Sequence, residues 1–272
     1  MAEFIVLNTG AQIPATGFGT WQILLNKRAK NAVMDALHAG YRLIDTAKIY
    51  GNEKGVGAAI RESGIEREKI FVTTKLWTGD QGYENALKAL ERSLNALGLD
   101  YIDLYLIHWP GSDKRRDSWT ALEEIYASGR AKAIGVSNYT VAHLEEIVDE
   151  FKITPAVNQI EFHPLIYHDQ LGVLEYCKAK NIVVEAYSPL IQGNLSIPLF
   201  DEIGKAHGKT AAQVVLRWCI QHDTIPIPKT SHLERMHENL DIFDFELSND
   251  EMHAINSLSD GTRTTWDPTK VS

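Results

Sequence analysis

Cysteine is scarce in this sequence, which holds only Cys177 and Cys219 among 272 residues. The two have no CxxC spacing, and each lies in an apolar, helix-like context. This pattern argues against a disulfide scaffold, a cysteine-based metal site and a redox pair. We therefore expect two reduced thiols in the core of a cytoplasmic protein.

The sequence also lacks an apolar run near the ~20 residues that a membrane-spanning helix needs. Its first eight residues are too few and too acidic to resemble a signal peptide. Basic residues are in deficit, since 36 Asp and Glu outnumber 27 Lys and Arg and the formal net charge is -9. We expect a soluble protein that binds neither nucleic acid nor membrane.

No Pro/Gly-rich linker, low-complexity segment or shift in composition divides the chain. Residues 1–272 are therefore predicted to form a single domain. Apolar residues make up 44% and charged residues 23%, which is ordinary globular usage and enough for a sizeable core. Nothing in the pattern suggests an obligate interface, so we expect a monomer.

Short apolar segments alternate with helical patterns along the chain. Residues 3–7 and 12–16 flank a turn at Asn8, Thr9 and Gly10 and predict an N-terminal β-hairpin. Eight strand–helix units follow, with strands at 15–20, 42–46, 70–75, 102–108, 133–137, 156–161, 183–187 and 224–228. The unbroken apolar character of these strands is typical of a parallel sheet covered on both faces.

This alternation predicts an α/β protein with a (β/α)8 TIM barrel, because eight units fit the usual length of about 250 residues. Helices at 199–207 and 248–258 are predicted as additions near the C-terminus. The rival fold is an open, doubly wound sheet. A dinucleotide-binding version would carry GxGxxG after its first strand, and Gly17 and Gly19 are not followed by that pattern.

Polar or aromatic residues follow the strands where the apolar runs end, and this is the end that bears the active site in such barrels. They are Thr20 and Trp21, Asp45, Lys75, His108, Ser137 and Asn138, Gln159 and Glu161, Tyr187 and Ser188, and Lys229. Their convergence indicates a polar pocket without specifying its reaction.

Asp45, Lys75 and His108 end three consecutive strands, so they are neighbours in the predicted barrel. A buried aspartate needs a partner, and Lys75 can provide it. The alternative is a purely structural ion pair. Tyr50 favours chemistry, because an ammonium beside a phenol lowers its pKa and prepares it for proton exchange. His108 can add a hydrogen bond to an oxygen between them.

The remaining histidines show no catalytic or metal-binding pattern. No His, Cys and Asp set has the spacing of metal ligands, and there is no nucleophile–base pair, so we expect no metal. His163, His168, His222 and His253 are interpreted as solvated or loop residues.

Several motifs, in order along nearly the whole chain, resemble the aldo-keto reductase family. They begin with the segment from Gly40 to Ala47, continue with Glu53 and Gly57, and include residues 17–21, 74–77, 106–110, 134–139, 158–164, 186–190 and 227–229. The short segments after Trp109 and Leu190 are similar to bacterial members such as the 2,5-diketo-D-gluconate reductases.

The resemblance implies an NADPH-dependent oxidoreductase that reduces small aldehydes and ketones, among them keto sugars or dicarbonyls. By motif, Tyr50 is the proton donor, Lys75 paired with Asp45 lowers its pKa, and His108 orients the carbonyl. Two prearranged donors at a developing oxyanion commonly contribute several kcal/mol.

The resemblance also implies a set of cofactor residues. Ser137, Asn138 and Gln159 would hold the nicotinamide carboxamide, and Tyr187 would stack on the ring. Ser188, Pro189, Leu190 and Gly193 would lie over the pyrophosphate, and Gly19, Thr20, Trp21 and Asp45 along the cofactor.

A helix predicted after Lys229 is the best anion site in this acidic chain, because a helix N-terminus and nearby cations favour phosphate. An ordinary capped helix with surface cations is the alternative. The resemblance assigns this site to the 2′-phosphate of NADP, held by Lys229, Thr230, Ser231, His232 and Arg235. It places Glu238 and Asn239 near the adenine.

Trp21, Trp77 and Trp109 would form an apolar substrate cleft beside Tyr50 and His108. Trp266 is a further candidate, although the tail 260–272 is short and polar. Lys48 would favour acidic substrates or be solvated, and we expect solvation.

Two other functions remain as alternatives. One is a cofactor-binding regulatory or accessory subunit, against which the intact set of Asp45, Tyr50, Lys75 and His108 argues. The other is a phosphate-binding isomerase or lyase, for which no second glycine-rich phosphate loop is present.

Overall fold

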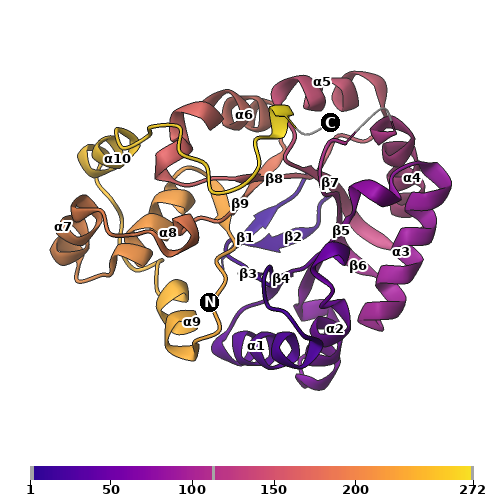
Figure 1. Cartoon of the computed structure of the whole chain (residues 1–272), viewed down its shortest axis with the longest axis horizontal. Coiled ribbons are helices and arrows are strands. Elements are labelled where there is room, and N and C mark those ends of the chain that lie inside the picture. The colour runs from indigo at the N-terminus through magenta and orange to yellow at the C-terminus, as the bar shows by residue number, and fades with distance from the viewer. Residues whose placement is uncertain (1–2, 112–113, 271–272) are drawn as a thin grey trace.

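The computed structural model describes residues 3–111 and 114–270, and at its centre is a sheet of eight parallel strands (Figure 1). The strands pair in the order in which they follow in the sequence. They are β3 (Phe18–Gly19), β4 (Leu43–Asp45), β5 (Phe71–Leu76), β6 (Ile102–Ile107), β7 (Ala131–Ser137), β8 (Val157–Glu161), β9 (Val183–Tyr187) and β10 (Thr224–Pro226).

Two backbone hydrogen bonds join the first strand of this sheet to the last. The Gly17 and Gly19 N–H groups donate to the carbonyl oxygens of Pro226 and Pro228, each at 3.0 Å. The sheet therefore closes on itself, and the predicted (β/α)8 barrel is confirmed. The predicted span 1–272 also includes residues 1–2, 112–113 and 271–272, which lie outside the described residues.

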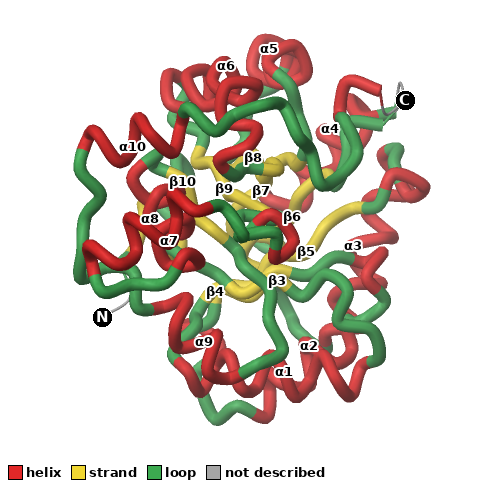
Figure 2. The backbone as a smooth tube through the Cα atoms, turned by 60° about the vertical axis from the view of Figure 1, so that its left-hand side comes forward, coloured by secondary structure: helices red, strands yellow, loops and turns green. Residues whose placement is uncertain are grey.

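Helices surround the strands in Figures 1 and 2. Those that follow the strands are α1 (Asn26–Ala39), α2 (Glu53–Glu62), α3 (Tyr83–Leu97), α4 (Arg115–Ala127), α5 (Val141–Glu150), α6 (Tyr167–Ala179), α8 (Ala211–Gln221) and α9 (Leu233–Leu240). The predicted additions are α7 (Pro198–His207) and α10 (Asn249–Asn256).

Local sequence explains where these helices begin and end. In α1 the small and apolar residues recur at helical spacing and are all buried against the sheet, and the helix stops at Gly40, whose φ of 118° favours glycine. Thr210 and Ser248 begin α8 and α10 through capping boxes, which satisfy N–H groups that the first turn leaves free.

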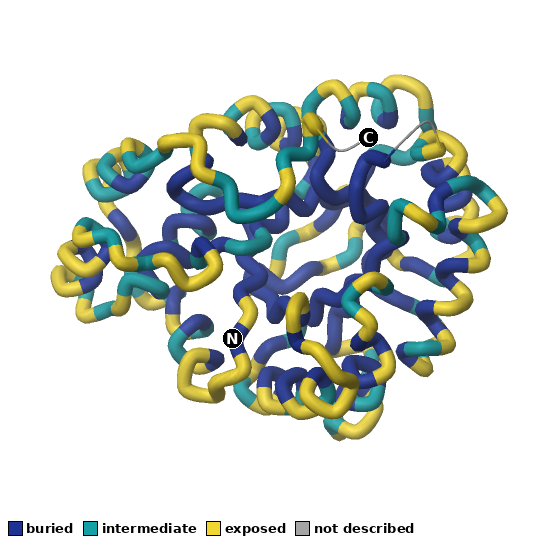
Figure 3. The backbone as a smooth tube through the Cα atoms, viewed as in Figure 1, coloured by how far each residue is buried: buried dark blue, intermediate teal, exposed yellow. Residues whose placement is uncertain are grey.

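The apolar core has two parts. One lies between the strands and the helices, so the strands are dark blue in Figure 3 while the outer helix faces are exposed. The other fills the amino-terminal end of the barrel, where the hairpin of β1 (Phe4–Val6) and β2 (Gln12–Pro14) packs Ile13 against Leu43 and Phe71. This end is thereby closed, which leaves the carboxyl ends of the strands for a site.

The cysteines lie in this core: Cys177 in α6 and Cys219 in α8 are both buried and unpaired. Within residues 3–111 and 114–270, no helix has the length and apolar character that crossing a membrane requires.

Candidate active site

Three neighbouring strands bring the predicted site residues Asp45, Lys75 and His108 to one end of the barrel. Asp45 is the last residue of β4, Lys75 is the penultimate residue of β5, and His108 follows β6 directly. Tyr50 ends a short 3-10 turn over Lys48–Tyr50, and Gly51 reverses the chain there with a φ of 67°. This turn returns the phenol over the barrel, above the strand ends.

The Lys75 ammonium is the point at which these groups meet. It is fully buried and donates to both carboxylate oxygens of Asp45 at 2.7 Å and to the Thr46 carbonyl at 3.0 Å. Its nitrogen lies 3.3 Å from the Tyr50 hydroxyl oxygen. The predicted contact of Asp45, Lys75 and Tyr50 is therefore present in the structure.

The charges in this cluster are fixed by opposing effects. Burial alone would lower the pKa of the Lys75 ammonium, but the negative charge of Asp45 and the Tyr50 oxygen outweigh it and raise that pKa. Lys75 therefore stays charged in the protein interior.

The Lys75 ammonium acts on the Tyr50 pKa in the predicted direction and lowers it, but it does not decide the net direction. Burial raises the pKa of Tyr50 above its ordinary value, Lys75 offsets part of this rise, and Asp45 adds to it. Burial is the largest of these effects, so the cost of desolvating the phenolate decides the net direction. Tyr50 is consequently protonated at neutral pH.

His108 is a neutral imidazole. Burial lowers its pKa well below the ordinary value, and the Lys75 charge lowers it further. The ring meets the Tyr50 and Trp77 rings edge-on, at centroid distances of 5.7 and 5.5 Å. Among the described residues, its buried Nδ1 has no hydrogen-bond partner.

The three residues predicted to hold a carboxamide form a connected network. The Asn138 side-chain amide donates to the His108 carbonyl at 3.0 Å and to the Ser137 hydroxyl at 3.1 Å. The Ser137 hydroxyl donates to the Gln159 carbonyl at 2.9 Å. Asn138 has a φ of 64°, which aims its amide across the strand ends rather than outward. The structure therefore brings Ser137, Asn138 and Gln159 together beside His108.

Sequence reasoning missed Glu185, a fully buried carboxyl in the middle of β9. The Gln159 amide nitrogen donates to Glu185 at 2.8 Å and to Asp45 at 2.9 Å. Burial and the nearby Asp45 charge raise the pKa of Glu185 to about 8, so it is largely protonated at neutral pH. The available signal was a lone acid between apolar residues in a strand buried on both faces.

Tyr187 ends β9 and begins a loop with unusual backbone geometry. Its hydroxyl lies 2.7 Å from Asn138 Oδ1 and 2.9 Å from the Thr265 hydroxyl. Ser188 has a φ of 50°, and Gly193 has one of 92°. Two adjacent loop residues, Ile191 and Gln192, share the left-handed region, which costs free energy outside glycine. Pro189 and Leu190 lie within this same loop.

The predicted anion site lies between β10 and α9. Lys229, Ser231, His232 and Arg235 are exposed, and Thr230 is buried with its hydroxyl accepting from the His232 N–H at 3.2 Å. Within the described part of the chain, no acidic side chain pairs with Lys229 or Arg235, so both cations remain available. Gly19 approaches closely, since a Cβ there would lie 2.9 Å from the Ile227 carbonyl oxygen.

The two residues predicted beside an adenine have partners of their own. Glu238 accepts from the Thr210 hydroxyl at 2.5 Å, and Asn239 is buried and hydrogen-bonded to the Tyr41 hydroxyl. They lie on the anion-site helix α9.

Tryptophans line the mouth of the barrel, with different degrees of burial. Trp109 is buried, Trp77 is half-buried, and Trp21 is exposed. The Trp109 ring lies 5.8 Å from that of Trp266, so the distant tail contributes to this wall. Thr20, beside Trp21, donates from its hydroxyl to the Asp45 carbonyl at 2.9 Å, which fixes the start of the loop.

Lys48, expected to be solvated, and His163 and His222, expected to be solvated or loop residues, all have side-chain partners; His222 Nε2 lies 3.0 Å from Asn256 Oδ1. Lys48 pairs with Asp80 at 2.5 Å, because its 3-10 turn carries it toward the turn Thr78–Asp80 that precedes α3. His163 is fully buried, with Nε2 3.2 Å from Glu161. His163 lies in a loop but is not solvated, because this loop passes beneath the C-terminal tail.

The sequence of this chain is similar to that of a known protein family and to that of individual proteins. A model of the Aldo/keto reductase family matches residues 15–260. The glyoxal reductase of Bacillus subtilis (strain 168) is 47% identical over 272 residues, which cover 100% of this chain and 98% of that protein.

Solved structures agree with this match. An aldo-keto reductase from a Medee basin deep-sea metagenome library has a TM-score of 0.94 at 45% identity, covering 99% of this chain and 100% of that one. A Bombyx mori aldo-keto reductase in complex with NADP has a TM-score of 0.90 at 35% identity, covering 97% and 94%.

Glu185→Gln should remove a pH dependence of stability. A carboxyl in the unfolded chain titrates near ~4.3, and the folded one titrates at about 8. Between these values folding takes up a proton, so wild-type stability falls as pH rises through this window. When the pH is raised from 5.5 to 8.5, the midpoint of urea unfolding should fall more for the wild type than for the variant. Equal changes would mean that Glu185 is already ionised in the folded protein at pH 5.5.

Proposed function

The chain belongs to the aldo/keto reductase family, and on this premise we propose that it reduces small aldehydes and ketones to alcohols, with hydride supplied by bound NADPH and the proton by Tyr50. The observation that carries this proposal is the single buried ammonium of Lys75, which contacts both Asp45 and the Tyr50 hydroxyl.

Tyr50 is suited to donate a proton in the direction of reduction. Its raised pKa keeps the phenol protonated at neutral pH, which is the form that the reaction consumes. The phenolate that remains lies 3.3 Å from the Lys75 ammonium, whose positive charge stabilises it. Lys75 thus acts on the product of the proton transfer, and Asp45 keeps Lys75 in place and charged.

His108 is suited to position the carbonyl oxygen. As a neutral imidazole it can donate one hydrogen bond without bringing a second positive charge next to Lys75. Its ring faces Tyr50 at 5.7 Å between centroids, so a substrate oxygen between the two rings would receive hydrogen bonds from both. Two fixed donors at the oxygen that gains charge lower the barrier to reduction.

The residues present fit NADPH. Lys229 and Arg235, with the hydroxyls of Thr230 and Ser231 and the N-terminus of α9, where His232 is the N-cap residue, would hold the 2′-phosphate. Other residues would bind the rest of the dinucleotide: Gly19, Thr20, Trp21, Asp45, Ser137, Asn138, Gln159, Tyr187, Ser188, Pro189, Leu190, Gly193, Glu238 and Asn239. The Bombyx mori relative was solved with NADP, which supports this assignment.

The substrate would be small and uncharged. Trp21, Trp77, Trp109 and Trp266 make the mouth apolar, and Lys48 is held in an ion pair with Asp80, an acid that it shares with Arg92. The similarity to a glyoxal reductase supports dicarbonyls as one class of substrate.

We take residues 1–272 as one domain and the enzyme as a monomer. Its buried, unpaired cysteines agree with a cytoplasmic location.

The alternative of a regulatory or accessory subunit is less well supported. Such a subunit would bind the cofactor without needing a proton donor. Asp45, Tyr50, Lys75 and His108 are all present and in contact, and the relatives compared above are named as reductases.

Tyr50→Phe should lower turnover of an aromatic aldehyde by about 10²–10⁴-fold, the usual contribution of a general acid. NADPH oxidation followed by absorbance measures the rate. NADPH fluorescence quenching should be unchanged, because the ring is retained. Tyr83→Phe, on the outer helix α3, is the matched control and should retain full activity.

Two outcomes would contradict this assignment. Unchanged turnover in Tyr50→Phe would remove the proposed donor. Absence of turnover by the wild type with a panel of aldehydes, ketones and dicarbonyls would reject the enzyme and favour the accessory subunit.

Arg235→Ala should weaken NADPH binding roughly 10–100-fold, because a hydrogen bond to a charged group contributes about 1.5–3 kcal/mol. NADH binding should change little, since NADH lacks the 2′-phosphate. Fluorescence titration of both cofactors makes the comparison, with Lys205→Ala on α7 as a matched loss of an exposed cation. Equal losses for NADPH and NADH would show that Arg235 does not read the 2′-phosphate.

A further inference from the structure

The C-terminal tail is tied to the end of β8 by one buried carboxylate. In Figure 1 the chain leaves α10 and crosses β9 and β8 toward α5. There Glu161, the last residue of β8, accepts from the Thr264 N–H at 2.5 Å, the Thr264 hydroxyl at 2.6 Å and the Thr265 hydroxyl at 2.8 Å. The Arg263 guanidinium lies 3.9 Å from the same carboxylate. Tail residues thus supply most of its partners.

This carboxylate keeps its charge over the working pH range. Burial would raise the pKa of Glu161, but the hydrogen bonds from His163, Thr264 and Thr265 outweigh burial and lower it to about 2. An ionised, buried carboxylate is costly without its donors, so releasing the tail would leave it partly unsatisfied. Glu161 is therefore a permanent anchor of the tail rather than a pH switch.

Thr265 also contacts the group that would hold the nicotinamide. Its hydroxyl lies 2.8 Å from Glu161 and 2.9 Å from the Tyr187 hydroxyl. The Tyr187 hydroxyl in turn lies 2.7 Å from Asn138 Oδ1. A chain of polar contacts thus runs from Glu161 in β8 through the tail to Asn138.

This chain has fewer hydrogens than contacts. Thr265 and Tyr187 have one hydroxyl proton each, while three contacts connect them with Glu161 and Asn138. The carboxylate is the strongest acceptor, so the Thr265 proton goes to Glu161. The single Tyr187 proton must then serve either Asn138 or Thr265.

We propose that Tyr187 couples cofactor binding to tail attachment, with Glu161 and Thr265 as positioning residues. The proposal rests on the proposed function, in which the carboxamide binds at Asn138. When the amide of a bound ligand donates a hydrogen bond to Asn138 Oδ1, that oxygen no longer depends on the hydrogen bond from the Tyr187 hydroxyl. Its proton then turns to Thr265, and the tail gains one hydrogen bond.

This coupling reaches the substrate side because Trp266 follows Thr265 directly. The Trp266 ring is exposed and lies against Trp109, at 5.8 Å between centroids, in the wall of the mouth. Holding Thr265 more firmly fixes Trp266 as well. The enzyme would therefore complete its carbonyl pocket only after NADPH is bound.

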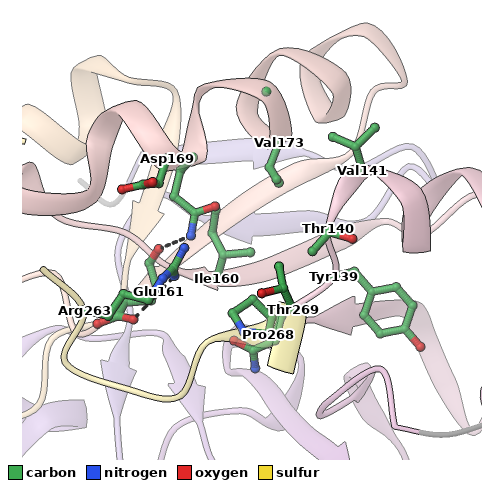
Figure 4. Close-up of a pocket in the computed structure, with 13 residues that line it drawn as sticks. Tyr139, Thr140, Val141, Ile160, Glu161, Asp169, Val173, Arg263, Pro268 and Thr269 are labelled. Atoms are coloured by element: carbon green, nitrogen blue, oxygen red, sulfur yellow. Dashed lines mark hydrogen bonds and ion pairs between the residues drawn. The ribbon is translucent and has the colours of Figure 1, made fainter. Parts of the chain in front are cut away.

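The tail has room to adjust. Figure 4 shows a pocket of about 230 Å³ between the tail and the β7–α5 loop, lined by Thr140, Val141, Glu161, Arg263, Pro268 and Thr269 among others. The tail is not packed tightly against α5 and α6 on this side. Small shifts at Thr265 therefore need not disturb the core.

Hydrogen exchange of residues 258–270, with and without NADP⁺, tests the coupling. In the wild type, NADP⁺ should slow exchange in this segment roughly fivefold, the effect of one net hydrogen bond of about 1 kcal/mol. Thr265→Val should bind NADP⁺ but lose this slowing, and Thr265→Ser should restore it. Thr264→Val should speed exchange in the free enzyme yet keep the response to NADP⁺, because its hydroxyl contacts only Glu161.

The control is Thr269→Val, a tail residue whose hydroxyl bonds locally to Asp267. It should match the wild type in both states. If NADP⁺ binds the wild type but leaves tail exchange unchanged, or if Thr265→Val keeps the slowing, the coupling is wrong and the proposed function stands. If NADP⁺ does not bind the wild type at all, the proposed function itself fails.

Discussion

The buried ion pair of Lys75 and Asp45 is the contact on which the rest of the site depends. Two charges in a barrel interior are tolerated only when their geometry is good and their other hydrogen-bonding groups are satisfied. Adjacent parallel strands meet this requirement, and the Lys75 ammonium finds both Asp45 oxygens, the Thr46 carbonyl and Tyr50 within 3.3 Å. The barrel thus holds a cation against a phenol, and this arrangement underlies the proposed chemistry.

Three buried carboxyl groups at this end of the barrel serve different purposes because their partners differ. Asp45 faces the Lys75 ammonium and accepts a hydrogen bond from it with each carboxylate oxygen. Glu185 shares the Gln159 amide with Asp45, pairs with no cation among residues 3–111 and 114–270, and holds a proton. Glu161 receives its hydrogen bonds from the tail and from His163, and it remains charged. The same functional group therefore holds an ammonium at Asp45, braces an amide at Glu185 and anchors the tail at Glu161.

Local patterns were sufficient to predict the barrel and the meeting of Asp45, Tyr50, Lys75 and His108, since strand alternation places strand ends together. Glu185 stands out in the sequence only as a lone acid in an apolar strand, and its contact with Gln159 becomes visible once the stagger of the strands is known. The direction of the Tyr50 pKa depends on burial and two opposing charges, whose balance no spacing reveals. The contact of Trp266 with Trp109 joins positions far apart in sequence, and His163 is buried by that same tail.

The central claim is that burial raises the pKa of Tyr50 while Lys75 and Asp45 shift it in opposite directions. The most direct test is a ¹³C NMR titration of the Tyr50 ring carbon that bears the hydroxyl. Its signal is assigned by its loss in Tyr50→Phe. The titration is run on the wild type, Asp45→Asn and Lys75→Met. Asp45→Asn should lower the Tyr50 pKa, because an uncompensated ammonium remains beside the phenol. Lys75→Met should keep Tyr50 protonated to the highest pH at which the protein stays folded. Shifts of the same sign in both variants, or no shift in either, would contradict the account.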